Sequence, residues 1–133
     1  MIDQLTVFLE NTEGRLASLC GTLAEANINM SALTIAETSE YGLVRIICDN
    51  ATAAVEVLEL AGFRATKTKV LAVVLPNRPG SLAELLAVLD IAGVNIEYGY
   101  CFSSEDEKAI DVLKVIDYKT AETAIKKAGF EVL

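Results

Sequence analysis

The chain has 133 residues, a length that fits one ordinary domain or two minimal ones. A hydrophobic fraction of 53% with 23% charged residues excludes disorder, collagen and coiled coil. The net charge of −8 argues against a nucleic-acid partner, and no apolar run is long enough to cross a membrane, so we expect a cytoplasmic protein with neither partner.

The first half of the chain alternates strand-like and helix-like patterns. Residues 4–9 are apolar enough for a buried strand, and a turn with Asn11 and Gly14 follows. One helix face is then predicted from Leu16, Leu19, Leu23 and Ala26. Asn27 follows where a left-handed cap is expected. The remaining predicted elements are strands at 29–37 and 42–49, a helix across 54–61 and a short strand from Phe63.

The second half repeats this pattern. When Leu5 is aligned with Leu71, identical residues recur through the turn and along the helix to Asn29 and Asn95. Gly93 takes the cap position of Asn27. The predicted elements are strands at 69–75, 95–102 and 108–117, helices across 82–92 and 121–128, and a short strand from Phe130. Residues 1–66 and 67–133 therefore form two copies of one module.

The order strand, helix, strand, strand, helix, strand predicts the fold class. It is α+β, with two ferredoxin-like βαββαβ units, each an antiparallel four-stranded sheet that carries both helices on one face. Such a sheet leaves its other face uncovered, and the apolar composition of so short a chain favours a homodimer over a monomer.

The turn between the first strand and first helix of each copy is the candidate binding feature. A helix start presents unpaired backbone N–H groups that attract a carboxylate, glycine lets a ligand approach the backbone, and asparagine offers a donor and an acceptor. Such a turn could hold both ends of a zwitterion. The alternative is structural, with Asn11 and Asn77 shaping turns and Gly14 and Gly80 meeting a steric need.

A family resemblance favours binding. The stretch Asn77-Arg78-Pro79-Gly80-Ser81-Leu82-Ala83, followed after one helix by Ala92-Gly93-Val94-Asn95-Ile96, resembles the signature of ACT domains, and the first copy matches it more loosely. ACT domains are regulatory modules that commonly bind amino acids where two modules meet. Carried over to this chain, the resemblance implies ligand-binding positions at Asn77, Arg78, Gly80, Ser81, Leu82, Asn95 and Ile96, and at Asn11, Gly14, Arg15, Leu16, Asn29 and Met30.

The two turns differ in charge. Glu10 and Glu13 flank the first and oppose a carboxylate, whereas Arg78 in the second favours one. We therefore place the ligand's carboxylate at the second turn. Glu97 or asparagine carbonyls are candidates for its ammonium group, although a solvated surface role for Glu97 is the simpler interpretation.

The resemblance implies a non-catalytic regulatory protein that binds a small amino acid between ACT modules and signals by a change of conformation or association. One alternative is the regulatory small subunit of an amino-acid biosynthetic enzyme, similar to that of acetolactate synthase. Another is a structural dimerisation device. A small enzyme such as an acyl-phosphate hydrolase is a further alternative.

Several residue types argue against catalysis and cofactors. The chain has no histidine, and it lacks the glycine-rich phosphate motifs. The acidic residues are expected in turns and on helix exteriors, so no buried catalytic carboxylate is predicted. Glu105-Asp106-Glu107 lacks the spacing of an EF-hand, so no metal is predicted there. Cys20, Cys48 and Cys101 are expected to be buried small hydrophobes.

Overall fold

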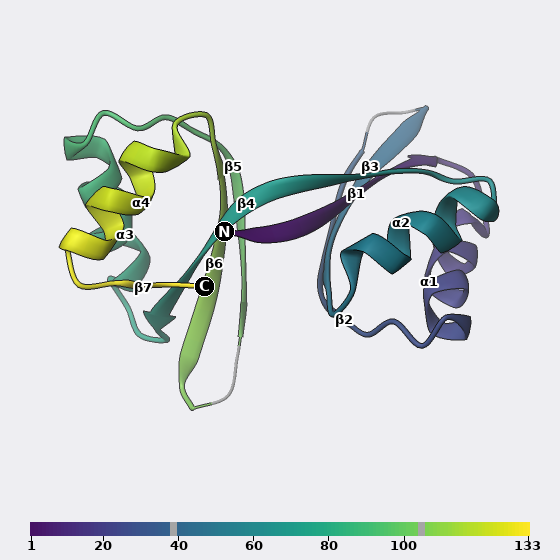
Figure 1. The fold of residues 1–133 in the computed structure, drawn as a ribbon, viewed down its shortest axis with the longest axis horizontal. Coiled ribbons are helices and arrows are strands. Elements are labelled where there is room, and N and C mark those ends of the chain that lie inside the picture. The colour runs from purple at the N-terminus through teal and green to yellow at the C-terminus, as the bar shows by residue number, and fades with distance from the viewer. Residues whose placement is uncertain (38–39, 104–105) are drawn as a thin grey trace. The chain divides into compact units, whose positions relative to one another are not determined.

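The computed structural model describes residues 1–37, 40–103 and 106–133, and it contains two βαββαβ units. The chain divides into a first unit, Asp3–Thr68, and a second unit, Lys69–Leu133 together with Met1–Ile2. The elements are β1 (Ile2–Glu10), α1 (Arg15–Glu25), β2 (Met30–Glu37), β3 (Tyr41–Cys48), α2 (Ala51–Leu60), β4 (Arg64–Pro76), α3 (Ser81–Ile91), β5 (Ile96–Ser103), β6 (Lys108–Val115), α4 (Tyr118–Lys127) and β7 (Glu131–Val132) (Figure 1). The predicted α+β class and element order are confirmed.

The two expected four-stranded sheets are not clearly present. The hydrogen-bonded strand order is β2-β3-β1-β4-β6-β5, with β7 paired to β4. The thirteen-residue strand β4 combines the last strand of the first unit with the first strand of the second. No glycine or proline interrupts residues 64–75, and Thr66 and Thr68 favour extended backbone, so nothing in the sequence ends the strand there.

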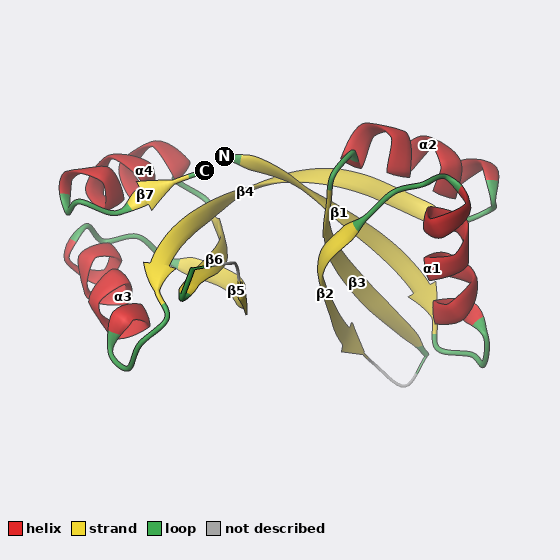
Figure 2. Ribbon diagram, turned by 90° about the horizontal axis from the view of Figure 1, so that it is seen from below, coloured by secondary structure: helices red, strands yellow, loops and turns green. Residues whose placement is uncertain are grey.

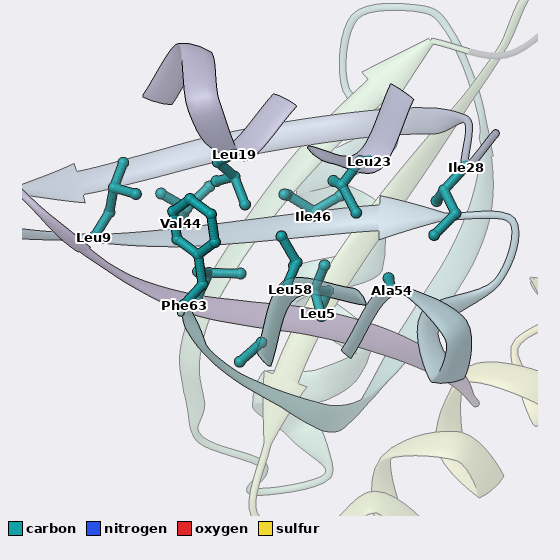
Figure 3. Packing of buried hydrophobic residues seen from close by; sticks show 12 residues of the cluster. Leu5, Leu9, Leu19, Leu23, Ile28, Val44, Ile46, Ala54, Leu58 and Phe63 are labelled. Carbon is teal, nitrogen blue, oxygen red and sulfur yellow. The ribbon is translucent and has the colours of Figure 1, made fainter. Parts of the chain in front are cut away.

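Both helices of each unit lie on the same face of its strands, as Figures 1 and 2 show. In the first unit α1 and α2 bury their apolar faces on alternate residues of β1 and β3. The labelled core residues in Figure 3 are Leu5, Leu9, Leu19, Leu23, Ile28, Val44, Ile46, Ala54, Leu58 and Phe63. In the second unit, Leu71 and Val73 of β4 pack with Leu85 and Leu89 of α3 and Ile125 of α4. Each unit therefore has its own core.

Turn chemistry ends the first helix of each unit as predicted. Asn27 has φ 57° after α1, and Gly93 has φ 70° after α3. The second helices begin with side-chain caps, since Asn50 accepts a hydrogen bond from the N–H of Ala53 and Asp117 accepts one from that of Thr120. Residues 38–39, between β2 and β3, and residues 104–105, between β5 and β6, lie outside the described residues.

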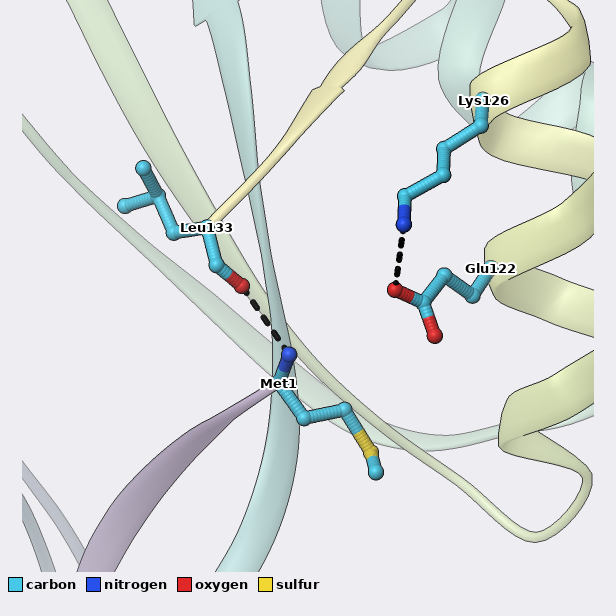
Figure 4. A network of polar contacts seen from close by, with 4 residues as sticks. All are labelled: Met1, Glu122, Lys126 and Leu133. Atoms are coloured by element: carbon cyan, nitrogen blue, oxygen red, sulfur yellow. Dashed lines mark hydrogen bonds and ion pairs between the residues drawn. The ribbon is translucent and has the colours of Figure 1, made fainter.

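The two chain termini meet in the second unit. The amino group of Met1 donates a hydrogen bond to the carbonyl oxygen of Leu133 over 3.0 Å, and the N–H of Leu133 donates to the carbonyl of Ala72 over 2.8 Å (Figure 4). On α4 in the same view, Lys126 and Glu122 form an ion pair at 2.8 Å. The last residues of the chain are thus tied to β4.

Candidate functional site

The turn between β4 and α3 is built by backbone hydrogen bonds. The N–H of Asn77 donates to the carbonyl of Glu107 over 2.8 Å, and the N–H of Arg78 donates to that of Pro76 over 2.9 Å. Gly80 then adopts φ 91°, a left-handed conformation that a side chain disfavours. Apart from its two chain neighbours, no described residue has an atom within 4 Å of the position a Cβ would take, so the conformation, and not the available space, calls for glycine.

Helix α3 begins without a side-chain cap. The N–H of Ser81 donates to Arg78 and that of Glu84 donates to Gly80, whereas those of Leu82 and Ala83 have no partner in the described part of the chain. Two adjacent unpaired N–H groups at a helix start are suited to an anion such as a carboxylate. The Ser81 side chain is buried and its hydroxyl is unpaired among the described residues.

Arg78 is partly neutralised in this state. Its guanidinium lies 3.7 Å from the carboxylate of Glu84, and both side chains are 56% exposed. An ion pair so exposed contributes little to stability, so a bound carboxylate can compete for Arg78. Arg78 also lines an open pocket of about 610 Å³ with Lys108 and Glu131.

The structure brings together two of the predicted residues of the second unit. Leu82 at the start of α3 and Ile96 at the start of β5 line a pocket of about 260 Å³. Asn77, Gly80 and Asn95 do not line this pocket, and all three are exposed. The pocket therefore lies beside the predicted turn, between α3 and the strands.

An acidic residue that sequence reasoning placed outside any core lies in this pocket. Asp111 of β6 is only 2% exposed, and Oδ2 of its carboxylate has no partner among the described residues. The expectation that all acids lie in turns and on helix exteriors is therefore wrong. The alternation along β6 indicates this burial, because the side chain of Asp111 lies on the same face of the strand as the buried side chains of Leu113 and Val115.

Cys101 of β5 lies next to this carboxylate. Its thiol donates a hydrogen bond to Oδ1 of Asp111 over 3.0 Å. Burial, then the hydrogen bond to Asp111 and its charge, raise the pKa of the Cys101 thiol to about 12. Burial also raises the pKa of the Asp111 carboxyl, and the bond from Cys101 opposes that shift. The thiol is thus a protonated donor and a poor nucleophile.

The expected burial of the cysteines is wrong in its detail. Cys20 and Cys48 are half-buried, and Cys101 is exposed as a residue although its thiol faces Asp111. Cys48 packs against the first core, whereas Cys101 lines the pocket.

The corresponding turn of the first unit has the same backbone. The N–H of Asn11 donates to the carbonyl of Glu40 over 3.1 Å, and Gly14 adopts φ 84° before α1. Arg15, however, stacks over the ring of Phe63 with 4.4 Å from the guanidinium carbon to the ring centroid. Arg15 therefore serves packing in this state.

The start of β2 is tied to β3. The N–H of Asn29 donates to the carboxylate of Asp49 over 3.2 Å, and the N–H of Asp49 donates to the carbonyl of Asn29 over 3.1 Å. Met30 packs against the first core, and Leu16 of α1 is 37% exposed. A structural role therefore accounts for the backbone of Asn29 and for Met30.

Comparisons with known proteins place the chain in a family. Residues 1–130 match the family model described as an ACT domain pair. The chain is 36% identical to protein BT0572 from Bacteroides thetaiotaomicron, with a TM-score of 0.93 over 98% of this chain and 90% of that one. The protein belongs to the ACT domain family, as an ACT domain pair.

Two further solved structures share the fold. One is the regulatory subunit of aspartate kinase from Thermus thermophilus, with 23% identity and a TM-score of 0.69 over 96% of this chain and 92% of that chain. The other is the same subunit from Thermus flavus, with 21% identity and a TM-score of 0.63 over 95% and 91%. No curated protein sequence matches the chain.

The described residues also lack features of two other kinds of protein. No helix in residues 1–37, 40–103 and 106–133 is long and apolar enough to span a membrane. Within the same ranges no three acidic or cysteine side chains are grouped as metal ligands, while Glu105 lies outside them. Three expectations stay predictions: that the named residues bind a ligand, that the ligand lies between modules, and that the protein is a homodimer.

Proposed function

We propose that this ACT domain pair is a non-catalytic regulatory protein that binds a small amino acid and signals by a change of conformation or association. The observation that carries the proposal is the start of α3, where the N–H groups of Leu82 and Ala83, unpaired within the described part of the chain, lie beside a largely apolar pocket. The N–H groups suit a carboxylate, and the pocket suits a small apolar side chain.

Binding of an amino acid does not by itself make this protein a sensor. A ligand shifts a conformational equilibrium only if it binds one state more tightly, and a typical coupling is about 1–3 kcal/mol. In the proposed site the ligand's carboxylate replaces Glu84 as the ion-pair partner of Arg78, which alters the charge pairing at the start of α3. A change at this helix start provides a signal that a partner chain can read.

Calorimetry and thermal shift with the twenty amino acids test the proposal. At least one amino acid should bind, and Asn77→Ala and Asn95→Ala should weaken its binding by about 1–3 kcal/mol for each buried hydrogen bond to the ligand that is removed. The control Asp90→Asn, at the exposed far end of α3, should leave this affinity unchanged. Neither heat nor thermal shift with any amino acid would remove the sensing role.

The regulated partner is proposed to be an amino-acid biosynthetic enzyme. The fold is shared with proteins named as regulatory subunits of aspartate kinase, and the resemblance to the small subunit of acetolactate synthase suggests a second candidate. Affinity purification should recover a larger catalytic chain, and added amino acid should alter the yield. Recovery of this protein alone in both conditions would contradict an enzyme partner.

A small enzyme is the competing function. Acyl-phosphate hydrolysis needs an anion-cradling loop and a positioned arginine, and Arg78 is the cation of the second turn. Saturable turnover of acetyl phosphate that is abolished in Arg78→Ala would replace the regulatory proposal with a catalytic one.

A further inference from the structure

We propose that the pocket between α3 and strands β5 and β6 receives the ammonium group of a small apolar ligand, with the Asp111 carboxylate as its counter-charge. This inference rests on the proposed function, since it assigns to this pocket the ammonium end and the apolar body of the amino acid. It names Asp111 as the binding residue and an aliphatic amino acid as the ligand class.

The state of the carboxylate is the first argument. Asp111 is 2% exposed, and the Cys101 thiol occupies only Oδ1, so Oδ2 is a buried acceptor without a donor in the described part of the chain. A buried polar atom that lacks a hydrogen bond is costly, and most such atoms in native proteins have a partner. A ligand ammonium would supply both the missing donor and the opposite charge.

The first unit has a valine at the position that corresponds to Asp111. Val44 of β3 lies opposite Val7, whereas Asp111 of β6 lies opposite Val73, so Asp111 takes the position of a fully buried valine. The sheet in the first unit needs no carboxylate here, and its valine is part of the core. Packing therefore does not account for an acid at this position.

The residues at two neighbouring positions also have smaller side chains in the second unit than in the first. Ile35 of β2 faces Val44, whereas Cys101 of β5 faces Asp111. Two residues along the same strands, Leu33 of the first unit corresponds to Gly99 of the second. A Cβ on Gly99 would lie 2.8 Å from the Leu113 side chain. A large apolar side chain is thus replaced by the thiol of Cys101 beside the carboxylate, while the Leu113 side chain takes the space next to Gly99.

The walls define the class of ligand. Leu82, Leu86, Ile96 and Leu113 make an apolar lining, and the pocket of about 260 Å³ admits a side chain of a few carbons. Asp111 is the charged residue among those that line it. The pocket therefore suits an ammonium and disfavours a carboxylate, while the apolar walls disfavour acidic and basic side chains. These features together select an aliphatic amino acid or its amine.

Calorimetry with the full chain tests the pocket. The probes are L-alanine, L-valine, L-leucine and L-isoleucine, each paired with the amine that lacks its carboxylate. At least one amino acid and its amine should bind, and Asp111→Asn should weaken both by about tenfold or more, as expected when a charge-assisted hydrogen bond is removed from a buried site. Asp111→Val, which copies the first unit, should abolish binding.

The controls separate folding from binding. Asp90→Asn removes an exposed aspartate at the far end of α3 and should leave the affinity unchanged. Thermal unfolding of Asp111→Asn and Asp111→Val should occur no lower than that of the wild type, so an absence of binding would not reflect an unfolded protein.

The outcomes distinguish this inference from the proposed function. If amino acids bind with equal affinity to the wild type and Asp111→Asn, the pocket assignment is overturned and amino-acid sensing stands. If the amines bind in an Asp111-dependent way and no amino acid binds, the pocket assignment stands and the sensing role fails. If no probe binds, the pocket assignment is overturned.

Discussion

The thiol of Cys101 donates a hydrogen bond to Oδ1 of Asp111 over 3.0 Å, across the β5–β6 pair, where the two residues lie directly opposite each other. The bond satisfies one oxygen of a carboxylate that is 2% exposed, and the other oxygen is unpaired among the described residues. The second unit therefore keeps an incompletely satisfied acid in a row of buried apolar residues. Stability, pH dependence and thiol reactivity should all reflect this arrangement.

Asp111→Val should stabilise the ligand-free protein at neutral pH by about 1–3 kcal/mol, because it removes a buried acceptor without a donor. Urea denaturation measures the free energy of unfolding. The reciprocal change Val44→Asp, at a fully buried position of the first unit, should destabilise by about 3 kcal/mol or more. Equal unfolding midpoints for Asp111→Val and the wild type would show that the acid carries no cost.

The contribution of Asp111 to the free energy of unfolding should fall as pH rises through the titration of this residue. Burial raises the pKa of its carboxyl in the folded protein, so the folded state binds more protons than the unfolded chain between the two pKa values. The decrease should begin near the ordinary aspartate value of about 4 and level off above the raised pKa.

The other ionisable groups that line the pocket are Cys101 and Tyr100 of β5, while α3 and the rest of β6 contribute leucines. The pKa of Cys101 is raised to about 12, so its thiol does not titrate in this range. Denaturation of Asp111→Asn over the same pH values isolates the carboxyl. Parallel curves for the two proteins would contradict a raised pKa at Asp111.

Cys101 should react slowly with iodoacetamide although the residue is exposed. With a pKa of about 12, roughly one thiol in ten thousand is ionised at pH 8, and the thiolate is the reactive form. Cys20→Ser with Cys48→Ser leaves Cys101 as the single thiol, and adding Asp111→Asn removes a neighbouring charge that disfavours the thiolate. Alkylation followed by mass spectrometry should be faster in that variant, and an unchanged rate would argue against control by Asp111.

Gly14→Ala and Gly80→Ala should each destabilise the protein by about 1–2 kcal/mol, since both glycines hold positive φ before a helix. Gly21→Ala is the matched control, because Gly21 lies within α1 and no described atom outside its own helix backbone and chain neighbours lies within 4 Å of a new Cβ. It should stabilise by about 0.5–1 kcal/mol through helix propensity. Thermal denaturation compares the three variants, and a decrease of stability in all three would contradict the conformational argument.

The local patterns of the sequence predicted most of the fold. Leucines at helical spacing from Leu16 to Leu23 and again from Leu82 to Leu89 placed α1 and α3, and Asn27 and Gly93 marked where these helices end. These features depend on neighbours within a few residues, so a sequence displays them directly. The long strand β4 was missed as one element because an internal repeat suggests a boundary where the backbone has none.

The residues that line the candidate pocket were named only in part from the sequence, and the ligand roles of the named residues stay predictions. Leu82 and Ile96 were named from the resemblance to ACT domains, and the structure places both at one pocket, whereas Asp111 was overlooked as a surface acid. Its burial depends on the residues that lie across from it on β4 and β5 and above it on α3. Those contacts join residues distant in sequence, and no local pattern fixes them.

The amino-acid sequence by itself determined the repeat, the order of the elements and the glycine turns at Gly14 and Gly80, because propensity, periodicity and left-handed backbone are local properties. Only the tertiary structure decided that Asp111 and Val44 occupy equivalent sheet positions and that one is a core residue while the other faces a pocket. Cross-strand register set that difference, since it determines which side chains share a face and how much space they leave.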